Sequence, residues 1–303
     1  MLTFTLMRNL WGNLVNNATS SALSVGDTLM SQSYKQLTSA RDWDFLQRTK
    51  TASTVASQQF YNLPGDYDKL ETCYVTIGDI IYTPKEAPSR SFWDRLNYST
   101  TFTSDIPEWF FVFNGTLGFW PIPSASTSDA ITYVYRKRVP DLNIADYTTG
   151  NISAITTATT AVTGSGSSWS TPMAGRYLRA TATDTANGSG DGLWYEISSV
   201  GSATTITLVD AYLGQTISTN TAYTIGQVPV LPEPYQVLPV YRAAQLYYMS
   251  IQPEAERADR YRLLYEELYA NLLAEYGSKT SNVVLDRGYN PPLNPNLFPY
   301  QIG

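Results

Sequence analysis

The sequence predicts an α+β protein with a helical bundle body, a small β-sheet region and an inserted antiparallel β domain. Three observations carry this prediction. Apolar residues near both ends of the chain recur at three- and four-residue steps, as on one face of a helix. Residues 131–136 alternate between large apolar and more polar side chains, as in a half-buried strand. Residues 146–228 are dominated by Thr, Ser, Gly and Ala, a composition that disfavours helix.

Residues 2 to about 50 are expected to be helical. Ser24 and Asp27 are candidate starts for a second helix, because their side chains suit an N-cap. The apolar positions at helical spacing are Leu6, Leu10, Leu14, Leu29, Met30, Tyr34, Leu37 and Trp43.

Five strands are expected after a Ser/Thr-rich connector and a turn at residues 62–67. They span residues 70–77, 79–83, 109–113, 116–120 and 130–136. Asn114-Gly115 separates two aromatic runs, and this dipeptide is typical of a tight hairpin. The region is therefore expected to form a small β-sheet.

The insert domain is expected over residues 146–228, with turns near residues 164–166, 187–190 and 201–202. Helices are expected over residues 236–250 and 253–277, the second ending before a glycine. The predicted division is a main body of residues 1–145 and 229–277, the insert domain of residues 146–228, and an extended docking arm of residues 278–303.

The predicted arm, residues 278–303, is too apolar for a solvated tail, yet four prolines exclude helix and central strand. Fully extended, it reaches roughly 80 Å at about 3.1 to 3.3 Å per residue. We therefore expect it to bind a second chain. The candidate partner-binding residues are Tyr289, Pro291, Pro292, Leu293, Leu297, Phe298, Tyr300 and Ile302.

Composition excludes several classes of function. The formal net charge is −6, and no basic stretch is denser than residues 136–138, so tight binding to nucleic acid through phosphates is not expected. The chain has no histidine and one cysteine, Cys73, which removes the common nucleophile systems and the usual zinc sites. We expect no enzyme activity, no catalytic residue, no metal and no cofactor.

Two alternatives involve the insert domain. Trp169 and Trp194 are candidate surface residues for binding carbohydrate, which would make the protein a component of a tail appendage. Asp184, Asp191 and Glu196 are acids that a cell-wall glycosidase could use, since glycoside cleavage needs two carboxylates. Asp in a Gly/Ser/Asn loop is, however, favoured for turn formation alone.

The order of segments resembles a known family. Residues 39–46, 60–70, 114–123 and 133–135 occur in the order seen in head-to-tail adaptor proteins of short-tailed bacteriophages. The resemblance covers about residues 5–145 and 235–276. Within the insert domain, four segments are similar to β modules that recur in phage tail and head-closure proteins, namely residues 162–169, 175–177, 194–197 and 208–214.

The resemblance implies a structural protein of the virion, made in the host cytoplasm and placed at the head-tail junction. Its subunits would form a ring of about twelve copies, a dodecamer, beneath the portal protein. Such a connector extends the DNA channel used in DNA ejection and gives tail tube or nozzle proteins a docking surface during tail assembly. DNA would pass through without sequence-specific binding, and no membrane is involved.

Overall fold

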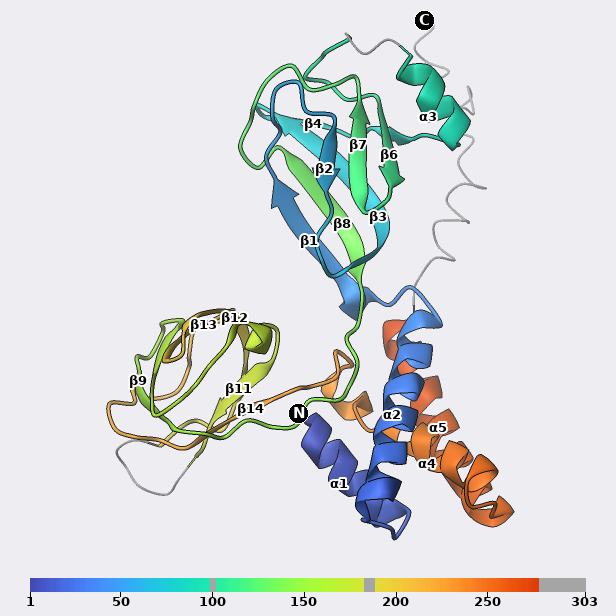
Figure 1. The fold of residues 1–303 in the computed structure, drawn as a ribbon, viewed down its shortest axis with the longest axis vertical. Coiled ribbons are helices and arrows are strands. Elements are labelled where there is room, and N and C mark those ends of the chain that lie inside the picture. The colour runs from blue at the N-terminus through green and yellow to red at the C-terminus, as the bar shows by residue number, and fades with distance from the viewer. Residues whose placement is uncertain (99–101, 183–188, 278–303) are drawn as a thin grey trace, which may run out of the picture. The chain divides into compact units, whose positions relative to one another are not determined.

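The computed structural model describes residues 1–98, 102–182 and 189–277 (Figure 1). In this part of the chain the fold is mixed α+β, with five α-helices and three sheets, so the predicted α+β class is confirmed. The chain forms two compact units. The helical unit combines Met1–Ala40 with Pro140–Glu275, and the sandwich unit contains Arg41–Val139 together with Tyr276 and Gly277. The predicted sheet region and the terminal helices thus belong to different units.

Four helices belong to the helical unit: α1 (Phe4–Leu14), α2 (Ser20–Ser39), α4 (Leu238–Ser250) and α5 (Ala255–Tyr276). The expected helix up to about residue 50 was too long, because α2 ends at Ser39. The start of α2 was also predicted too late. Thr19 caps this helix, and its side chain accepts a hydrogen bond from the Ala22 amide. The two C-terminal helices lie within two residues of their predicted bounds.

Close packing joins these helices. Trp11 of α1 is fully buried and meets the Tyr247 ring edge-on at 5.3 Å. Gly26 of α2 lies against the same indole, and a Cβ atom there would stand 2.5 Å from the ring. Two tyrosine hydroxyls link the C-terminal helices to the end of α1. Tyr248 donates a hydrogen bond to the Val15 carbonyl, and Tyr261 donates one to the Leu14 carbonyl. Only glycine therefore fits at position 26 without displacing the indole.

The insert domain has six strands, paired antiparallel: β9 (Asn151–Ile155), β10 (Ala161–Ser165), β11 (Tyr177–Ala180), β12 (Trp194–Ser202), β13 (Thr205–Leu208) and β14 (Tyr223–Gly226). The strand order is β14-β11-β12-β13-β10-β9. Bridges between Tyr147 and Ile225, and between Ile152 and Thr221, join the two edges of this sheet. The sheet therefore curls into a barrel-like layer around its own core.

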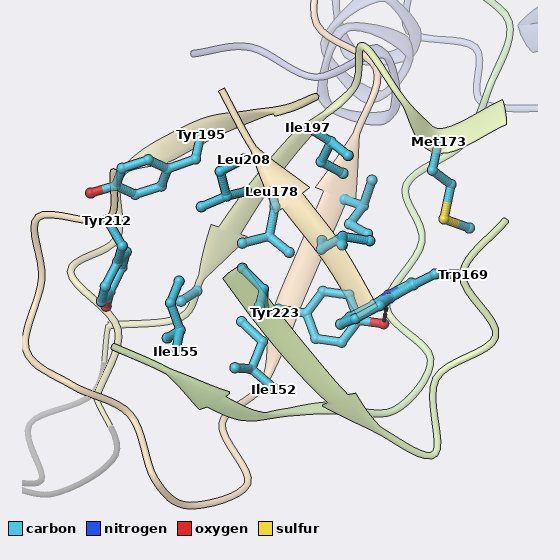
Figure 2. Packing of buried hydrophobic residues seen from close by; sticks show 14 of the residues in the cluster. Ile152, Ile155, Trp169, Met173, Leu178, Tyr195, Ile197, Leu208, Tyr212 and Tyr223 are labelled. Carbon is cyan, nitrogen blue, oxygen red and sulfur yellow. Dashed lines mark hydrogen bonds between the residues drawn. The ribbon is translucent and has the colours of Figure 1, made fainter. Parts of the chain in front are cut away.

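Large apolar side chains fill that core (Figure 2). Trp169 is only 3% exposed, and its indole N–H donates a 2.8 Å hydrogen bond to the Tyr223 hydroxyl. The predicted turn at residues 164–166 is present after β10, where Gly166 has a φ of 66°. The predicted turn at 201–202 lies slightly later, between β12 and β13. The predicted turn at 187–190 falls partly outside the described residues.

The sandwich unit contains two four-stranded sheets, ordered β1-β8-β3-β4 and β2-β7-β6-β5 (Figure 1). The elements are β1 (Gln47–Ala52), β2 (Phe60–Asn62), β3 (Tyr67–Ile77), β4 (Ile80–Tyr82), β5 (Lys85–Glu86), α3 (Arg90–Leu96), β6 (Trp109–Phe113), β7 (Thr116–Trp120) and β8 (Ile131–Lys137). Residues of both sheets share one apolar core. All five predicted strands are confirmed, including the hairpin at Asn114-Gly115, whose φ values of 49° and 74° match its tight turn.

The prediction that helix extends to about residue 50 is wrong for the segment Gln47–Ala52, which forms strand β1. Gln47–Ala52 is polar, and its pattern alone does not indicate a buried face. Pairing with β8 decides its conformation, since Arg48 and Lys50 lie opposite Tyr135 and Tyr133. Cross-strand contacts here outweigh local helix propensity.

Candidate interaction surfaces

An aromatic layer covers the outer side of the β2-β7-β6-β5 sheet. Helix α3 lies beside β6, and its Trp93 ring stacks on Phe111 at 5.6 Å (Figure 1). The neighbouring Phe92 contacts Trp109 at 4.8 Å, and the Arg90 guanidinium lies 4.3 Å from the Phe113 ring. Gly118 of β7 allows this approach, because a Cβ atom there would stand 2.8 Å from the Trp93 ring.

Exposed large hydrophobic side chains occur on this layer and elsewhere in the sandwich unit. Within its described residues, eight are exposed: Val55, Phe60, Ile80, Ile81, Tyr98, Phe102, Ile106 and Phe113. Tyr98 is 95% exposed and Ile81, on β4 of the other sheet, 63%. Exposed apolar side chains mark a surface that other proteins cover where they form a contiguous patch.

Charged residues gather on the other sheet of the sandwich unit. Arg136 of β8 contacts carboxylate oxygens of Asp42 at 2.8 Å and of Asp68 at 2.6 Å, and Lys69 reaches Asp42 at 3.0 Å. The hydrogen bond from Lys69 and the nearby Arg136 lower the pKa of Asp42. Arg136, which belongs to the most basic stretch of the chain, is thus paired with carboxylates of the same chain. This pairing leaves less positive charge to bind the phosphates of a nucleic acid.

A groove of about 680 Å³ lies at one end of the insert domain, where Met1 and Glu233 from outside that domain also line it. Among its lining residues are Arg179, Leu193, Trp194, Tyr195, Asp210 and Leu213. Leu193 is 52% exposed and Leu213 74%, so the groove has an apolar rim. The guanidinium of Arg179 lies 5.8 Å from the Trp194 ring, within reach of a cation–π contact.

Hydrogen bonds fix the backbone of this rim. One oxygen of the Asp191 carboxylate accepts from the Leu193 amide at 3.0 Å, and the other accepts from the Tyr195 hydroxyl. That hydroxyl in turn accepts from the Leu213 amide at 3.0 Å. Burial, followed by the hydrogen bond to Asp191, raises the pKa of Tyr195 to about 12, so it stays protonated and continues to donate. Asp191 and Tyr195 therefore hold both exposed leucines in place.

The two tryptophans proposed for carbohydrate binding lie in different environments. Trp169 belongs to the buried core, which corrects its expected position on the surface (Figure 2). Its Ser-rich surroundings in sequence suggested exposure, but the curling of the sheet encloses it. Trp194 is half-buried at the groove.

The acids considered for catalysis have other partners. Asp191 is engaged in the rim described above, and Glu196 lies 3.5 Å from the Tyr177 hydroxyl. Successive strand residues point to opposite faces, so Glu196 faces away from Tyr195, which Asp191 contacts. Asp184 lies outside the described residues. These contacts favour a structural role for Asp191.

The predicted arm also lies outside the described residues, which end at Gly277. Its candidate contacts, among them Tyr289, Pro292 and Phe298, stay predictions. Sequence reasoning missed the exposed leucines Leu193 and Leu213. The available signal was that each leucine stands next to a glycine, Gly192 or Gly214, as in an exposed turn.

Comparison with protein families places the chain. The model of the SU10 adaptor protein family matches residues 8–181, more than half of the sequence. The chain belongs to the SU10 adaptor protein family. The match includes α2, residues 41–139 of the sandwich unit and the insert domain as far as β11. A search of curated proteins found no match.

Membership of this adaptor family supports a bacteriophage head-to-tail adaptor, a structural and non-enzymatic kind of protein located in the virion. It implies association with phage portal and tail proteins. Two further findings concern residues 1–98, 102–182 and 189–277 alone. They contain no helix long and apolar enough to span a membrane, and no cluster of three or more Cys, Asp or Glu side chains arranged to hold a metal ion.

Proposed function

We propose that this adaptor assembles into a closed ring of about twelve copies beneath the portal, where it extends the DNA channel and offers a docking surface to tail tube or nozzle proteins. The observation that carries the proposal is the family match over residues 8–181. In a cyclic ring each copy presents two different surfaces to its neighbours.

The exposed side chains of the sandwich unit support an assembled rather than a solitary protein. Phe60, Phe113 and Ile81 each leave much of their area in water. Burying apolar area yields about 25 cal/mol per Å², so covering such side chains contributes to assembly. We assign this surface to contacts within the ring.

The acidic balance of the chain supports a passive channel. A net charge of −6 disfavours adhesion to DNA, which has to move through the ring during packaging and ejection. The ion pairs of Arg136 with Asp42 and Asp68 act in the same direction, because they neutralise a basic side chain within the chain itself.

The arm of residues 278–303 completes the proposal. Its apolar residues gain a binding surface only when a second chain is present, so it orders on assembly. Deletion of residues 278–303 should leave a folded protein that no longer joins portal complexes.

The test is co-sedimentation of the full chain and of the deletion variant with purified portal protein, alongside circular dichroism to verify folding. We expect the full chain to sediment with portal and the folded variant to stay in the supernatant. Equal binding by both would remove the arm from the proposal. Absence of binding by the full chain would contradict the adaptor position itself.

A further inference from the structure

The groove of the insert domain has the properties of a built binding site. It encloses about 680 Å³, a volume within the range of ligand sites. Leu193 and Leu213 border it while remaining 52% and 74% exposed. Their amides are held by the Asp191 carboxylate and the Tyr195 hydroxyl. Side-chain hydrogen bonds thus fix the backbone of two leucines that face water.

The shape of the adjoining loop reinforces this rigidity. Gly214 follows Leu213, and a Cβ atom at this position would stand 2.3 Å from the Tyr212 hydroxyl oxygen. The Gly214 carbonyl accepts a 2.7 Å hydrogen bond from the Thr157 hydroxyl. A rim held in this way binds with a small loss of conformational entropy.

The chemistry of the rim favours a peptide over a sugar. Sugars are bound mainly by aromatic faces together with hydrogen-bonding groups, whereas this rim also exposes two aliphatic side chains, Leu193 and Leu213, beside the polar side chains of Arg179 and Asp210. The Trp194 ring already lies near the Arg179 guanidinium. Grooves that combine aromatic and aliphatic side chains accept proline-rich segments, whose extended helix is preformed.

The chain itself contains a segment of that kind. Residues 289–302 carry four prolines together with Leu, Phe, Tyr and Ile, and include no Asp, Glu, Lys or Arg. This segment lies outside the described residues. It belongs to a 26-residue stretch, residues 278–303, that spans roughly 80 Å when extended. That reach is enough to cross from one subunit to the next.

We propose that the groove bordered by Leu193, Trp194 and Leu213 binds residues 289–302 of a second copy of the chain. This inference rests on the proposed function, in which the arm docks on another chain, and it names the surface that receives the arm. Asp191 and Tyr195 act as positioning residues for the rim. Since the segment is uncharged, its binding depends on apolar contact and proline conformation, and hardly on salt.

The experiment measures fluorescence anisotropy of a labelled synthetic peptide of residues 288–303 titrated with the full chain. We expect saturable binding that changes less than about twofold between about 0.1 and 1 M salt. Leu213→Asp should weaken binding at least about tenfold, because it places a charge in an apolar contact. Leu263→Asp is the matched control, since this leucine is exposed on α5, away from the groove residues in sequence.

Asp191→Asn and Tyr195→Phe test the positioning role. Both leave the rim side chains intact, so they should weaken the peptide several-fold while Leu213→Asp weakens it more. A second labelled peptide, in which the four prolines are replaced by alanine, tests the occupant instead: it should bind poorly to every variant, because its extended conformation is no longer preformed.

Four results would overturn the inference. The first is that the peptide does not bind, and the second is that Leu213→Asp binds it as well as the unchanged chain. The third is that N-acetylglucosamine oligomers bind and that Leu213→Asp abolishes this binding. The fourth is that the monomeric full chain does not bind the peptide whereas the variant ending at residue 277 does. The last would place the arm in its own subunit. Failure here, combined with loss of portal binding on deleting the arm, would leave the adaptor function standing and redirect the arm to the portal.

Discussion

Replacing two tryptophans of the insert domain by alanine should give opposite outcomes. Trp169 is 3% exposed, packs against Tyr223 at 5.7 Å and donates to its hydroxyl. Truncating a buried tryptophan to alanine costs about 3–5 kcal/mol through lost contacts and a residual cavity. Trp194 is half-buried, and the Arg179 guanidinium lies over its ring, a contact worth about 0.5–1 kcal/mol.

The assay is differential scanning calorimetry of the full chain, with the transition of the insert domain identified by hydrogen exchange of strands β11 and β12. For a domain of this size 1 kcal/mol shifts the melting temperature by about 4–8 °C. Trp169→Ala should therefore lower that transition by at least about 12 °C. Trp194→Ala should shift it by less than about 8 °C.

A milder variant keeps the test informative if Trp169→Ala prevents folding. Tyr223→Phe removes the hydroxyl that accepts from Trp169 and donates to the Thr149 carbonyl. Leaving a buried N–H without an acceptor costs about 1–3 kcal/mol. Tyr98→Phe, at a tyrosine that is 95% exposed, is the control and should be neutral. Equal shifts for the two tryptophans, or for the two tyrosines, would refute the assignment of Trp169 to the core.

Three further predictions concern the other elements. Gly26→Ala should destabilise the helical unit, because overpacking against the rigid Trp11 ring costs about 1–3 kcal/mol and exceeds the helix-propensity gain of about 1 kcal/mol. Thermal unfolding should therefore show a lower melting temperature for Gly26→Ala and a higher one for Gly12→Ala, where the added Cβ is less crowded. The Cys73 thiol, whose pKa burial raises to about 12, should resist iodoacetamide at pH 8 and react only in denaturant, and rapid native alkylation would contradict its burial. The lowered pKa of Asp42 contributes stability above about pH 4, and this contribution disappears as the pH falls through the folded-state pKa. The free energy of unfolding of Asp42→Asn should therefore depend less on pH in the acid range than that of the unchanged protein. The same pH dependence in both proteins would count against the ion pairs of Asp42.

Elements with a strong local pattern could be predicted from the sequence. The alternation in residues 131–136 identified β8, and Asn114-Gly115 identified the β6-β7 hairpin. The stripe of Leu and Tyr in α5 gave that helix with nearly correct ends. In each case the residues that determine the element lie within it.

Elements determined by distant partners could not be predicted. Strand β1 is polar and adopts its conformation through pairing with β8, some eighty residues later in the chain. Trp169 lies between serines, yet the bridge of Tyr147 to Ile225 helps to close the sheet around it. The exposed rim of Leu193 and Leu213 depends on a hydrogen bond to Tyr195, which no local pattern announces.

Electron microscopy of purified chain mixed with purified portal protein tests the adaptor assignment most directly. We expect closed rings of about twelve copies seated on one face of the portal, with an open central channel, and no such rings when residues 278–303 are deleted. Portal particles that look the same with and without the full chain, at concentrations where both proteins are folded, would contradict the placement of this protein at the head-tail junction.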